Sequence, residues 1–320
     1  MDIGQSRAAP RPRRSLLALL VGAQSPYEAR KAVWGYFFLA PWLLGLLVFV
    51  GGPIVASFIL GFTEYDVLSP ARWVGLKNYT QALTGDRLFW PALGKTFYYA
   101  VVVVPVGLAG SLLLAILLNQ KLKVTNLFRT MFYLPHLTPA VTLSILWLWL
   151  MNPEIGPLNY VLRSLGFGKF PWLTDKNTVI PSLIVINLWA GMGGNNMLIF
   201  LAGLQGVPVE FFEAADLDGA SSWQKFVHVT LPMISPSILF NLTLGIIGAL
   251  QVFTTAFITT KGGPSYGSWF LALHIYQQAF AYFRMGYASA LSWIFVAIVM
   301  VLTVLNVRLS DRWVFYGGSV

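Results

Sequence analysis

The sequence predicts an all-α integral membrane protein with six transmembrane helices. Hydrophobic residues fill 57% of the 320 positions and only 10% are charged, whereas soluble domains carry about 25% charged residues. A helix needs about 20 consecutive, mostly apolar residues to cross a bilayer. Six stretches meet this requirement, at residues 34–62, 97–118, 131–151, 180–204, 234–258 and 287–308. We therefore expect one membrane domain at residues 34–309, between an N-terminal tail at 1–33 and a C-terminal tail at 310–320.

The basic residues set the expected topology. The net charge is +9, and six of the 21 Lys and Arg residues precede the first span. Basic residues beside a span favour its cytoplasmic side, so the N-terminus is expected inside. An even number of spans then returns the C-terminus to the cytoplasm. We attribute the positive charge to contact with anionic membrane lipid and expect no nucleic-acid partner.

The first residues admit a second interpretation. The stretch RPRRSLLALLVGAQS resembles a signal peptide, with a basic region, an apolar core and a small-residue end. Because the apolar core covers only Leu16–Ala23, we favour a basic cytoplasmic tail with a short helix on the membrane surface.

Prolines mark bends in the first and third spans. Pro41 and Pro53 lie inside the first span, and prolines usually kink membrane helices. The stretch WVGLKNYTQAL that follows is suited to a short surface helix, and the second span then runs to Leu118. Pro135 and Pro139 are expected to bend or delay the third span.

Glycines mark the later spans. In the fourth span, three glycines between residues 191 and 194 weaken the helix or allow close packing. The fifth span leads into TTKGGPSYGSW, which predicts a tight outer turn because Gly-Gly-Pro favours one. The sixth span ends at Arg308, on the inner side.

The composition excludes several kinds of chemistry. The chain has no cysteine, which excludes disulfides and thiolate metal sites, and its three histidines lack metal-ligand spacing. The spans contain no Asp or Glu, on which proton-coupled carriers depend. The GKT sequence at residues 94–96 resembles the end of a nucleotide-binding loop, but Phe89 stands where that motif needs glycine. We expect no enzyme activity, metal or cofactor on this chain, and an energy source outside its spans.

One polar segment, residues 205–233 between the fourth and fifth spans, departs from the apolar pattern. It holds a third of the chain's 12 acidic residues, namely Glu210, Glu213, Asp216 and Asp218. The first three recur at intervals of three and predict an amphipathic helix that begins at Pro208. Membrane-surface helices usually carry a basic polar face, so this acidic one favours a basic protein partner over lipid.

Two residues predict how this segment turns. Gly219 can take the left-handed conformation that ends a helix. Ser221 and Gln224 have the spacing of a capping box, which starts the next one. Pro232 closes that second helix before the fifth span. The expected structure is a helix, a tight turn and a second helix.

The same segment carries a resemblance. It is similar to the EAA loop, the signature of permease subunits of bacterial ABC importers, at Glu213-Ala214-Ala215, Asp218-Gly219-Ala220, Phe226, Leu231-Pro232 and Pro236. Stretches such as VGLKNY, WLWLMNPEIGPLN, KGGPSYG and GYASALSWIF also resemble carbohydrate-type permeases, from about residue 34 to 316. The maltose- and glycerol-phosphate-importer type is the most similar group.

The resemblance implies the type I ABC importer permease fold and a complex in the cytoplasmic membrane of a bacterium or archaeon. The complex would contain a second permease, two copies of an ATPase subunit and an extracytoplasmic substrate-binding protein. ATP and Mg would bind to the ATPase subunits, whose movement the EAA loop would transmit as a coupling helix. The residues implied in coupling are Glu213, Ala214, Ala215, Asp218, Gly219, Ala220, Trp223, Phe226, Leu231 and Pro232.

The resemblance also implies a sugar or a related polyol or glycoside as the solute. A sugar site needs a few hydrogen-bonding groups among apolar and aromatic ones, and the candidates are Trp189, Asn195, Asn196, Gln251 and Phe253. Asn and Gln also bond between membrane helices, so a purely structural role stays open for each. Thr254 stands where such permeases often have Asp, and the inserted outer domain of the large maltose permease is missing.

Three alternatives remain at this stage. An importer of glycerol phosphate or its diesters would favour a cationic group that the middle of the spans lacks. A stand-alone secondary transporter or channel would leave the acidic segment without an explanation. A scaffold without transport activity would use the segment for docking but would not need the glycines and amides of the fourth span.

Overall fold

The computed structural model describes residues 26–120 and 124–315, which fall into two compact units divided between Ile59 and Leu60. Most of the predicted N-terminal tail, with its alternative as a signal peptide, lies outside the described residues. The first unit is a run of helix made of α2 (Pro26–Leu46), the π-helical turn η1 (Leu47–Gly51) and α3 (Gly52–Leu60). Pro53 cannot donate a hydrogen bond to the carbonyl four residues earlier, and the π-helical turn beside it agrees with the distortion expected there.

The second unit begins with a small structure that the all-α prediction missed. Two-residue strands form an antiparallel pair and are followed by a short helix, at β1 (Thr63–Glu64), β2 (Arg72–Trp73), α4 (Lys77–Thr80) and η2 (Gln81–Gly85). The buried side chain of Asn78 donates to the carbonyls of Gly61 and Thr63, at 3.0 and 2.8 Å. The amide thus ties the helix expected in this stretch to the hairpin.

The described chain has four to six candidate spans. Four helices are long and apolar enough to cross a membrane by themselves, at Arg30–Leu60, Phe89–Leu118, Ser235–Thr259 and Met285–Ser310. The second and fourth of these are α5 and α17, and the third combines α14 (Ser235–Leu250) with α15 (Thr254–Thr259). Two further helix pairs pass the same test only as bent pairs.

The third predicted span, residues 131–151, is not one straight helix. α6 (Thr125–Leu137) and α7 (Ala140–Leu150) meet at 94°. Pro139 has an extended ψ of 136° directly before α7, so the bend expected at the prolines is present. α7 has 11 residues and extends about 16 Å at 1.5 Å per residue, less than the roughly 30 Å of a bilayer core. The predicted third span is thus a bent helix pair, which counts as a span only when the two helices are taken together.

The fourth predicted span is broken at its glycines. α9 (Val179–Gly191) and α10 (Asn195–Gln205) meet at 46°. A Cβ on Gly193 would lie 2.0 Å from the carbonyl oxygen of Phe132, and one on Gly194 would lie 2.6 Å from Nδ1 of His136. The break therefore packs against α6 at a distance that only glycine permits, as one of the two interpretations of these residues predicted.

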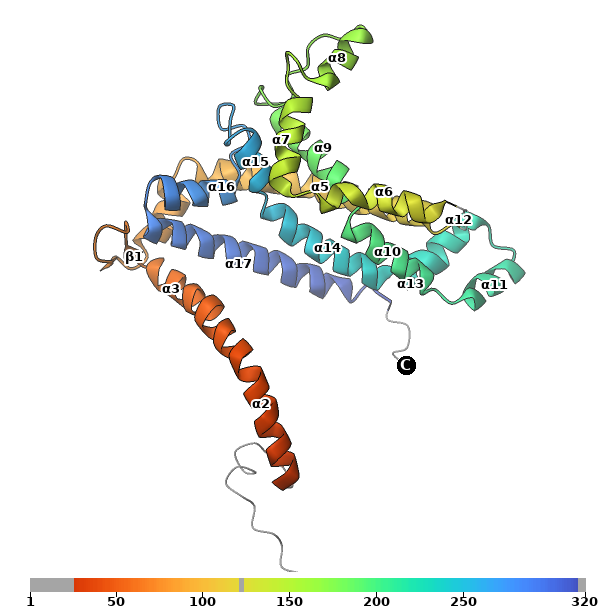
Figure 1. Ribbon diagram of the computed structural model, residues 1–320, viewed down its shortest axis with the longest axis horizontal. Helices are drawn as coiled ribbons and strands as arrows, with labels where there is room; N and C mark the ends of the chain where they lie inside the picture. Colours follow the sequence, from red (N-terminus) through yellow and green to blue (C-terminus); the bar gives the residue numbers. More distant parts are fainter. Residues whose placement is uncertain (1–25, 121–123, 316–320) are drawn as a thin grey trace, which may run out of the picture. The chain divides into compact units, whose positions relative to one another are not determined.

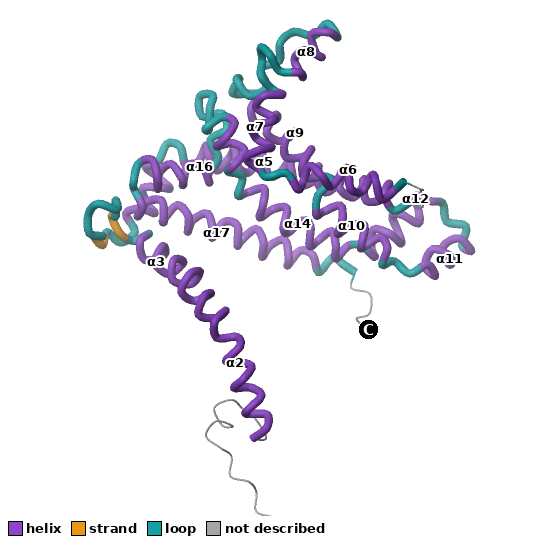
Figure 2. The backbone as a smooth tube through the Cα atoms, viewed as in Figure 1, coloured by secondary structure: helices purple, strands orange, loops and turns teal. Residues whose placement is uncertain are grey.

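Helix α5 lies at the centre of the second unit. It packs against α14, α10 and α9, while α17 packs against α14 (Figure 1, Figure 2). The main buried cluster draws on α5, α9, α14 and α17, while the buried residues of α10 form a second cluster with the end of α5. Within the main cluster, Tyr99 of α5 meets Phe270 edge to face, with ring centroids 5.3 Å apart. The long helices run roughly parallel, so the second unit has two distinct ends (Figure 1).

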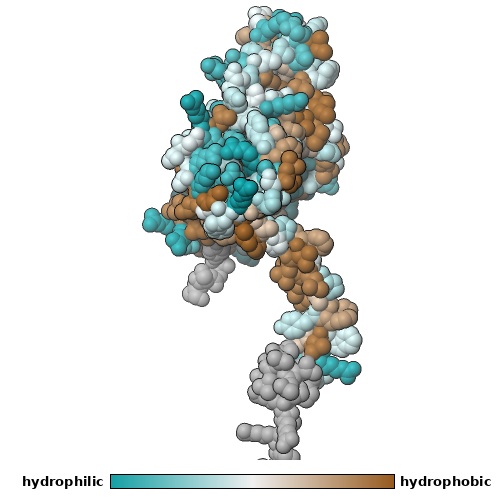
Figure 3. Space-filling view, turned by 90° about the vertical axis from the view of Figure 1, so that its left-hand side faces the viewer, coloured by the Kyte–Doolittle hydropathy of each residue, from teal (hydrophilic) through white to brown (hydrophobic). Residues whose placement is uncertain are grey.

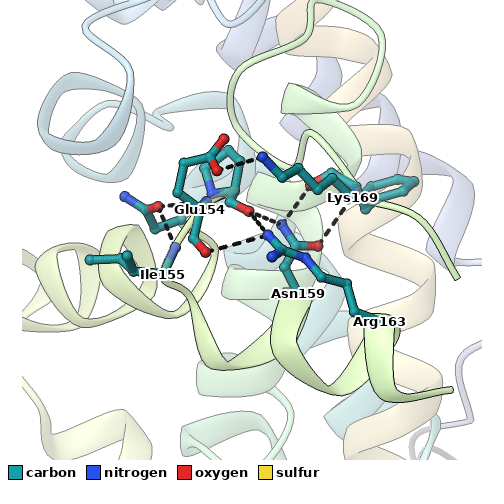
Figure 4. Close-up of polar contacts among 8 residues, drawn as sticks. Glu154, Ile155, Asn159, Arg163 and Lys169 are labelled. Atoms are coloured by element: carbon teal, nitrogen blue, oxygen red, sulfur yellow. Dashed lines mark hydrogen bonds and ion pairs between the residues drawn. The ribbon is translucent and has the colours of Figure 1, made fainter. Parts of the chain in front are cut away.

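A compact loop joins α7 to α9 and is built around α8 (Pro157–Ser164). The buried amide of Asn159 accepts a hydrogen bond from the N–H of Phe170 and donates one to its carbonyl. Lys169 pairs with Glu154 and holds the pKa of that carboxyl below its usual value (Figure 4). The loop is thus fixed by its own polar contacts.

The connection from α15 to α17 contains α16 (Leu271–Tyr276) and η4 (Gln277–Ala281). In Figure 1 it lies at the same end of the second unit as the β1–β2 hairpin. Figure 3 looks onto this end and shows hydrophilic side chains gathered over it, beside more apolar flanks. Such a polar end suits contact with water or a soluble partner.

Candidate functional site

The acidic segment 205–233 folds into two short helices at the opposite end of α14 from α15 (Figure 1). They are α11 (Val209–Leu217) and α12 (Ser222–Lys225), and α12 leads towards α14 through η3 (Phe226–Thr230) and α13 (Leu231–Met233). Pro208 directly precedes α11, with ψ of 138°, so the first helix begins one residue later than predicted. The predicted order of helix, turn and helix is confirmed.

Gly219 makes the turn between these helices. Its φ is +73°, and a Cβ at this position would meet nothing within 4 Å. The N–H of Ala220 donates to the carbonyl of Ala215 at 2.9 Å, and that of Gly219 donates to Asp216 at 3.1 Å. These two bonds form a Schellman motif. Replacing the glycine would therefore strain the backbone without causing a clash.

Ser221 starts the second helix with the predicted capping box. Its Oγ accepts from the N–H of Gln224 at 3.3 Å, while the side chain of Gln224 accepts from the N–H of Ser221 at 2.7 Å. The reciprocal bonds satisfy two of the free donors at the helix start. Because local bonds define both the end of α11 and the start of α12, the helix pair is a preformed unit.

The four acids of the segment divide into two groups. Asp216 forms an ion pair with Lys225 at 2.6 Å, which links α11 to α12. Glu210, Glu213 and Asp218 are exposed, and none of these three is in an ion pair with another described residue. Three negative charges are therefore free to meet a basic partner.

Apolar side chains on the same segment are uncovered. Leu217 is 91% exposed and Trp223 is 70% exposed. Trp223 contacts the partly buried Phe226, with ring centroids 5.6 Å apart. No residue of α11 or α12 is buried. Large exposed apolar side chains rimmed by charge are typical of a protein–protein interface.

A groove of about 310 Å³ runs along the turn between the two helices. Its lining includes Ala215 from α11, His228 from η3, and three residues from the turn, Asp218, Gly219 and Ala220. The structure thus brings together four residues that the resemblance implicated in coupling. Other residues that the resemblance implicated lie outside the groove. Glu213 and Ala214 are exposed on α11, and Leu231 and Pro232 are partly buried before α14. The coupling role of all of them stays a prediction.

A second candidate site is a cavity of about 690 Å³ between α5, α6, α9, α10 and α14. Its polar lining consists of His136, Asn187, Asn195 and Asn196. Of the described residues that line it, none is Asp, Glu, Lys or Arg. The hydroxyl of Tyr133 donates to Oδ1 of Asn195 at 3.2 Å. Such a surface offers hydrogen bonds without charge and is suited to a neutral, hydroxyl-rich solute.

The structure places only two of the five candidate solute contacts in this cavity, Asn195 and Asn196. Trp189 is half exposed and meets Trp147 edge to face, with centroids 5.6 Å apart. Phe253 stacks on Phe257 at 5.3 Å in an aromatic cluster, and Gln251 is exposed at the end of α14. None of these three is among the lining residues, and their part in solute binding stays a prediction.

Sequence reasoning missed two lining residues, His136 and Asn187. Asn187 is a lone amide in the apolar run of α9, two residues before Trp189, and that isolation was the available signal. His136 carried no such signal, because it reaches the cavity only through the crossing of α6 over the glycines of the fourth span.

The comparisons with known proteins decide the family. Residues 107–314 match the family described as binding-protein-dependent transport system inner membrane component. The chain belongs to this family of permeases. A probable ABC transporter permease of Bacillus subtilis, YesP, is 39% identical over 88% of this chain and 92% of its own length. The arabinooligosaccharide transport system permease AraP of the same organism is 36% identical over 91% and 93%.

The permease also shares its fold with a solved structure. The bacterial alginate ABC transporter, in complex with a periplasmic protein bound to an alginate pentasaccharide, has a chain that matches with a TM-score of 0.79. The match covers 89% of this permease and 96% of that chain at 21% identity, which supports the fold alone. The expected membership of the ABC importer permeases is confirmed, and such relatives are transport components rather than enzymes.

Proposed function

We propose that this permease is one of two different membrane subunits of an ATP-driven importer, and that its 205–233 segment is the coupling helix. The observation that carries the proposal is the preformed α11–α12 unit, with three unpaired acids and uncovered apolar side chains beside a groove. A basic and apolar surface of an ATPase subunit is its chemical complement. Closure of the ATPase pair on ATP would move this unit, and α13 and α14 would carry that movement into the membrane.

The remaining partners follow from the family. A binding-protein-dependent permease receives its solute from an extracytoplasmic binding protein, and the coupling end faces two ATPase copies that bind ATP and Mg. We propose six spans, counting each bent helix pair as one, in the cytoplasmic membrane of a bacterium or archaeon. Both termini are then cytoplasmic, on the same side as α11 and α12.

The solute that the cavity suits best is a sugar. Amide groups from α9 and α10 with no lysine or arginine in the described lining favour a neutral polyhydroxylated molecule, and the AraP relative transports arabinooligosaccharides by its name. A glycerol phosphate would favour a cation, so this alternative is not favoured. Membership of the ABC permease family also disfavours a stand-alone secondary transporter. Asn187, Asn195 and Asn196 are the proposed contacts.

The test of this function is purification of the tagged permease in mild detergent, with mass spectrometry and an ATPase assay. We expect an ABC ATPase and a second, different permease to co-purify in similar amounts, with vanadate-sensitive ATP hydrolysis. The matched control replaces the three unpaired acids (Glu210, Glu213 and Asp218) by their amides, which should weaken retention of the ATPase but not of the second permease. A permease that purifies alone and moves solute without ATP would contradict the proposal.

A further inference from the structure

A single buried hydroxyl joins three parts of the chain next to the coupling segment. Ser235, the first residue of α14, is 2% exposed. Its Oγ donates to the carbonyl of Pro232 at 2.6 Å and accepts from the backbone N–H of Phe315 at 2.8 Å. One side chain therefore connects α13, the start of α14 and the residues that follow α17.

The residues after α17 are held in place to make this bond. The N–H groups of Trp313 and Val314 donate to the carbonyl of Ser310, at 3.0 and 2.9 Å. Ser310 is 1% exposed, and its Oγ donates to the carbonyl of Val307 at 2.6 Å. These bonds turn the chain at the end of α17, so that it reaches Ser235 across a gap of 80 residues in sequence.

A second polar link joins the same two helices further along. Asn306 of α17 donates to Oγ of Thr243 of α14 at 2.8 Å, and Thr243 donates to the carbonyl of Leu239. This link connects helix to helix only. The link at Ser235 differs because it also includes the carbonyl of Pro232, which belongs to the coupling segment.

We propose that Asp311–Phe315 is a strap that makes α17 follow the coupling segment, with Ser235 as its positioning residue. The inference rests on the proposed function, since it assumes that 205–233 moves with the ATPase. Without the strap, a displaced Pro232 would reach α17 only indirectly, through the packing of α14 on α17 and the Asn306–Thr243 bond. Hydrogen bonds weaken steeply when they lengthen or bend. The two bonds that share Oγ of Ser235 therefore resist separation of Pro232, Ser235 and Phe315. The end of α17 is therefore displaced together with α14.

The absence of cysteine from this chain allows a direct test. A nitroxide label is placed on Leu309→Cys, 55% exposed at the end of α17, in the purified complex with its ATPase and second permease. A second preparation carries the label on Val209→Cys, 66% exposed at the start of α11, to report the coupling segment itself without replacing the uncovered apolar side chains Leu217 and Trp223. The signal is the change in the label's spectrum when ATP and orthovanadate are added.

Two variants remove the strap from opposite sides, and each has a matched control. Ser235→Ala removes the hydroxyl, whereas Ser235→Thr keeps one. Phe315→Pro removes the backbone N–H, whereas Phe315→Ala removes only the ring. We expect Ser235→Ala and Phe315→Pro to reduce the response at Leu309 about two- to thirtyfold, the range over which single residues modulate coupling between sites. The response at Val209 should stay, and both control variants should keep both responses.

The outcomes separate the strap from the coupling function. A full response at Leu309 in Ser235→Ala and Phe315→Pro would overturn the strap and leave the coupling segment intact. Loss of assembly in Ser235→Ala would also overturn it, because the hydroxyl would then serve stability only. No response at Val209 in the labelled complex with an intact strap, despite ATP hydrolysis, would instead contradict the coupling function on which the strap rests.

Discussion

At the scale of single residues, Asp86 organises the end of the second unit that lies away from the coupling segment. Its Oδ2 accepts from the hydroxyl of Tyr287 at 2.6 Å and from Nε2 of His274 at 2.9 Å, and its Oδ1 accepts from the N–H of Leu88. The indole of Trp269 donates to Nδ1 of His274 at 3.1 Å. Because an indole N–H can only donate, Nδ1 is the acceptor and the ring proton lies on Nε2. The carboxylate thereby ties the start of α5 to α16 and α17.

We expect Asp86→Asn to destabilise the permease by about 1–3 kcal/mol, because buried donors lose a charged acceptor. The measurement is thermal unfolding in detergent. The matched control is Glu64→Gln, whose carboxylate pairs with Lys77 at 3.6 Å while both side chains are more than 60% exposed. Exposed pairs of this kind are worth about 0–1 kcal/mol. Equal unfolding temperatures for the two variants would show that the network around Asp86 adds no stability.

The same carboxyl gives a pH dependence. Burial by itself would raise the pKa of Asp86, but hydrogen bonds from Tyr287, Leu88 and His274 outweigh it and leave the pKa below its ordinary value of 3.8. A lowered folded-state pKa contributes stability that is fully present above the unfolded-state pKa and is lost as pH falls through the folded-state value. The unfolding temperature of the wild type should therefore drop below about pH 4 more than that of Asp86→Asn. Parallel pH profiles would contradict this account.

How far the sequence predicts single residues depends on how local their contacts are. Gly219 and Ser221 were predicted with their conformations, because the helix end and the capping box use partners within five residues. His274 and Asp86 are 188 residues apart, and no pattern in the sequence pairs them. His136 could not be placed for the same reason.

At the scale of elements, the unusual feature is the pair of broken spans. α6 and α7 separate at Pro139, whose missing N–H and extended conformation end one helix and start another. α9 and α10 separate at Gly193 and Gly194, where α6 approaches the backbone. Both breaks lie beside the second candidate site, the cavity of about 690 Å³, since α6, α9 and α10 all line it. The breaks thus open backbone and amide groups towards a space inside the bundle.

We expect Gly193→Ala to destabilise the permease by about 1–3 kcal/mol, as overpacking does, because its Cβ would meet the carbonyl of Phe132 at 2.0 Å. The matched control is Gly191→Ala in the same broken helix, whose Cβ has an ordinary contact of 3.7 Å with Asn187. It should change stability by no more than about 0.5 kcal/mol. Thermal unfolding of both variants checks this, and a tolerated Gly193→Ala would disprove the close crossing of α6.

The positions of these breaks were predictable and their angles were not. Pro and Gly mark where a helix is weak. Pro135 and Pro139 predict the first break, and Gly193 and Gly194 predict the second. The angles of 94° and 46° depend on the elements that pack around each break, which the local sequence does not specify. A bend of the third span was therefore predicted at its prolines, but the near right angle that leaves α7 too short to cross a membrane alone was not.

At the scale of the whole molecule, the acidic segment 205–233 lies apart from the long apolar helices. The four long helices contain no Asp or Glu, whereas the acids of the coupling segment lie at one end of α14, outside these helices. Under the proposed function, movement of this segment would be transmitted through α13 and α14, with the turn at Gly219 as the first joint. Family and fold class were predictable because the apolar composition extends over most of the chain and the EAA signature is specific. The solute was not, because the cavity forms from helices distant in sequence.

The most direct measurement of the central claim is ATP-driven uptake, by the complete complex in liposomes, of the sugar that its binding protein retains on purification. Three complexes are compared, with the wild-type permease, Gly219→Asp and Gly75→Asp. Gly75 is a matched control, because it also has a positive φ, of +58°, and open space for a Cβ, but lies outside the coupling segment. We predict uptake at the ATP-free background for Gly219→Asp, with its subunits present in the membrane, and wild-type uptake for Gly75→Asp. Full uptake by Gly219→Asp would contradict the assignment of 205–233 as the coupling segment.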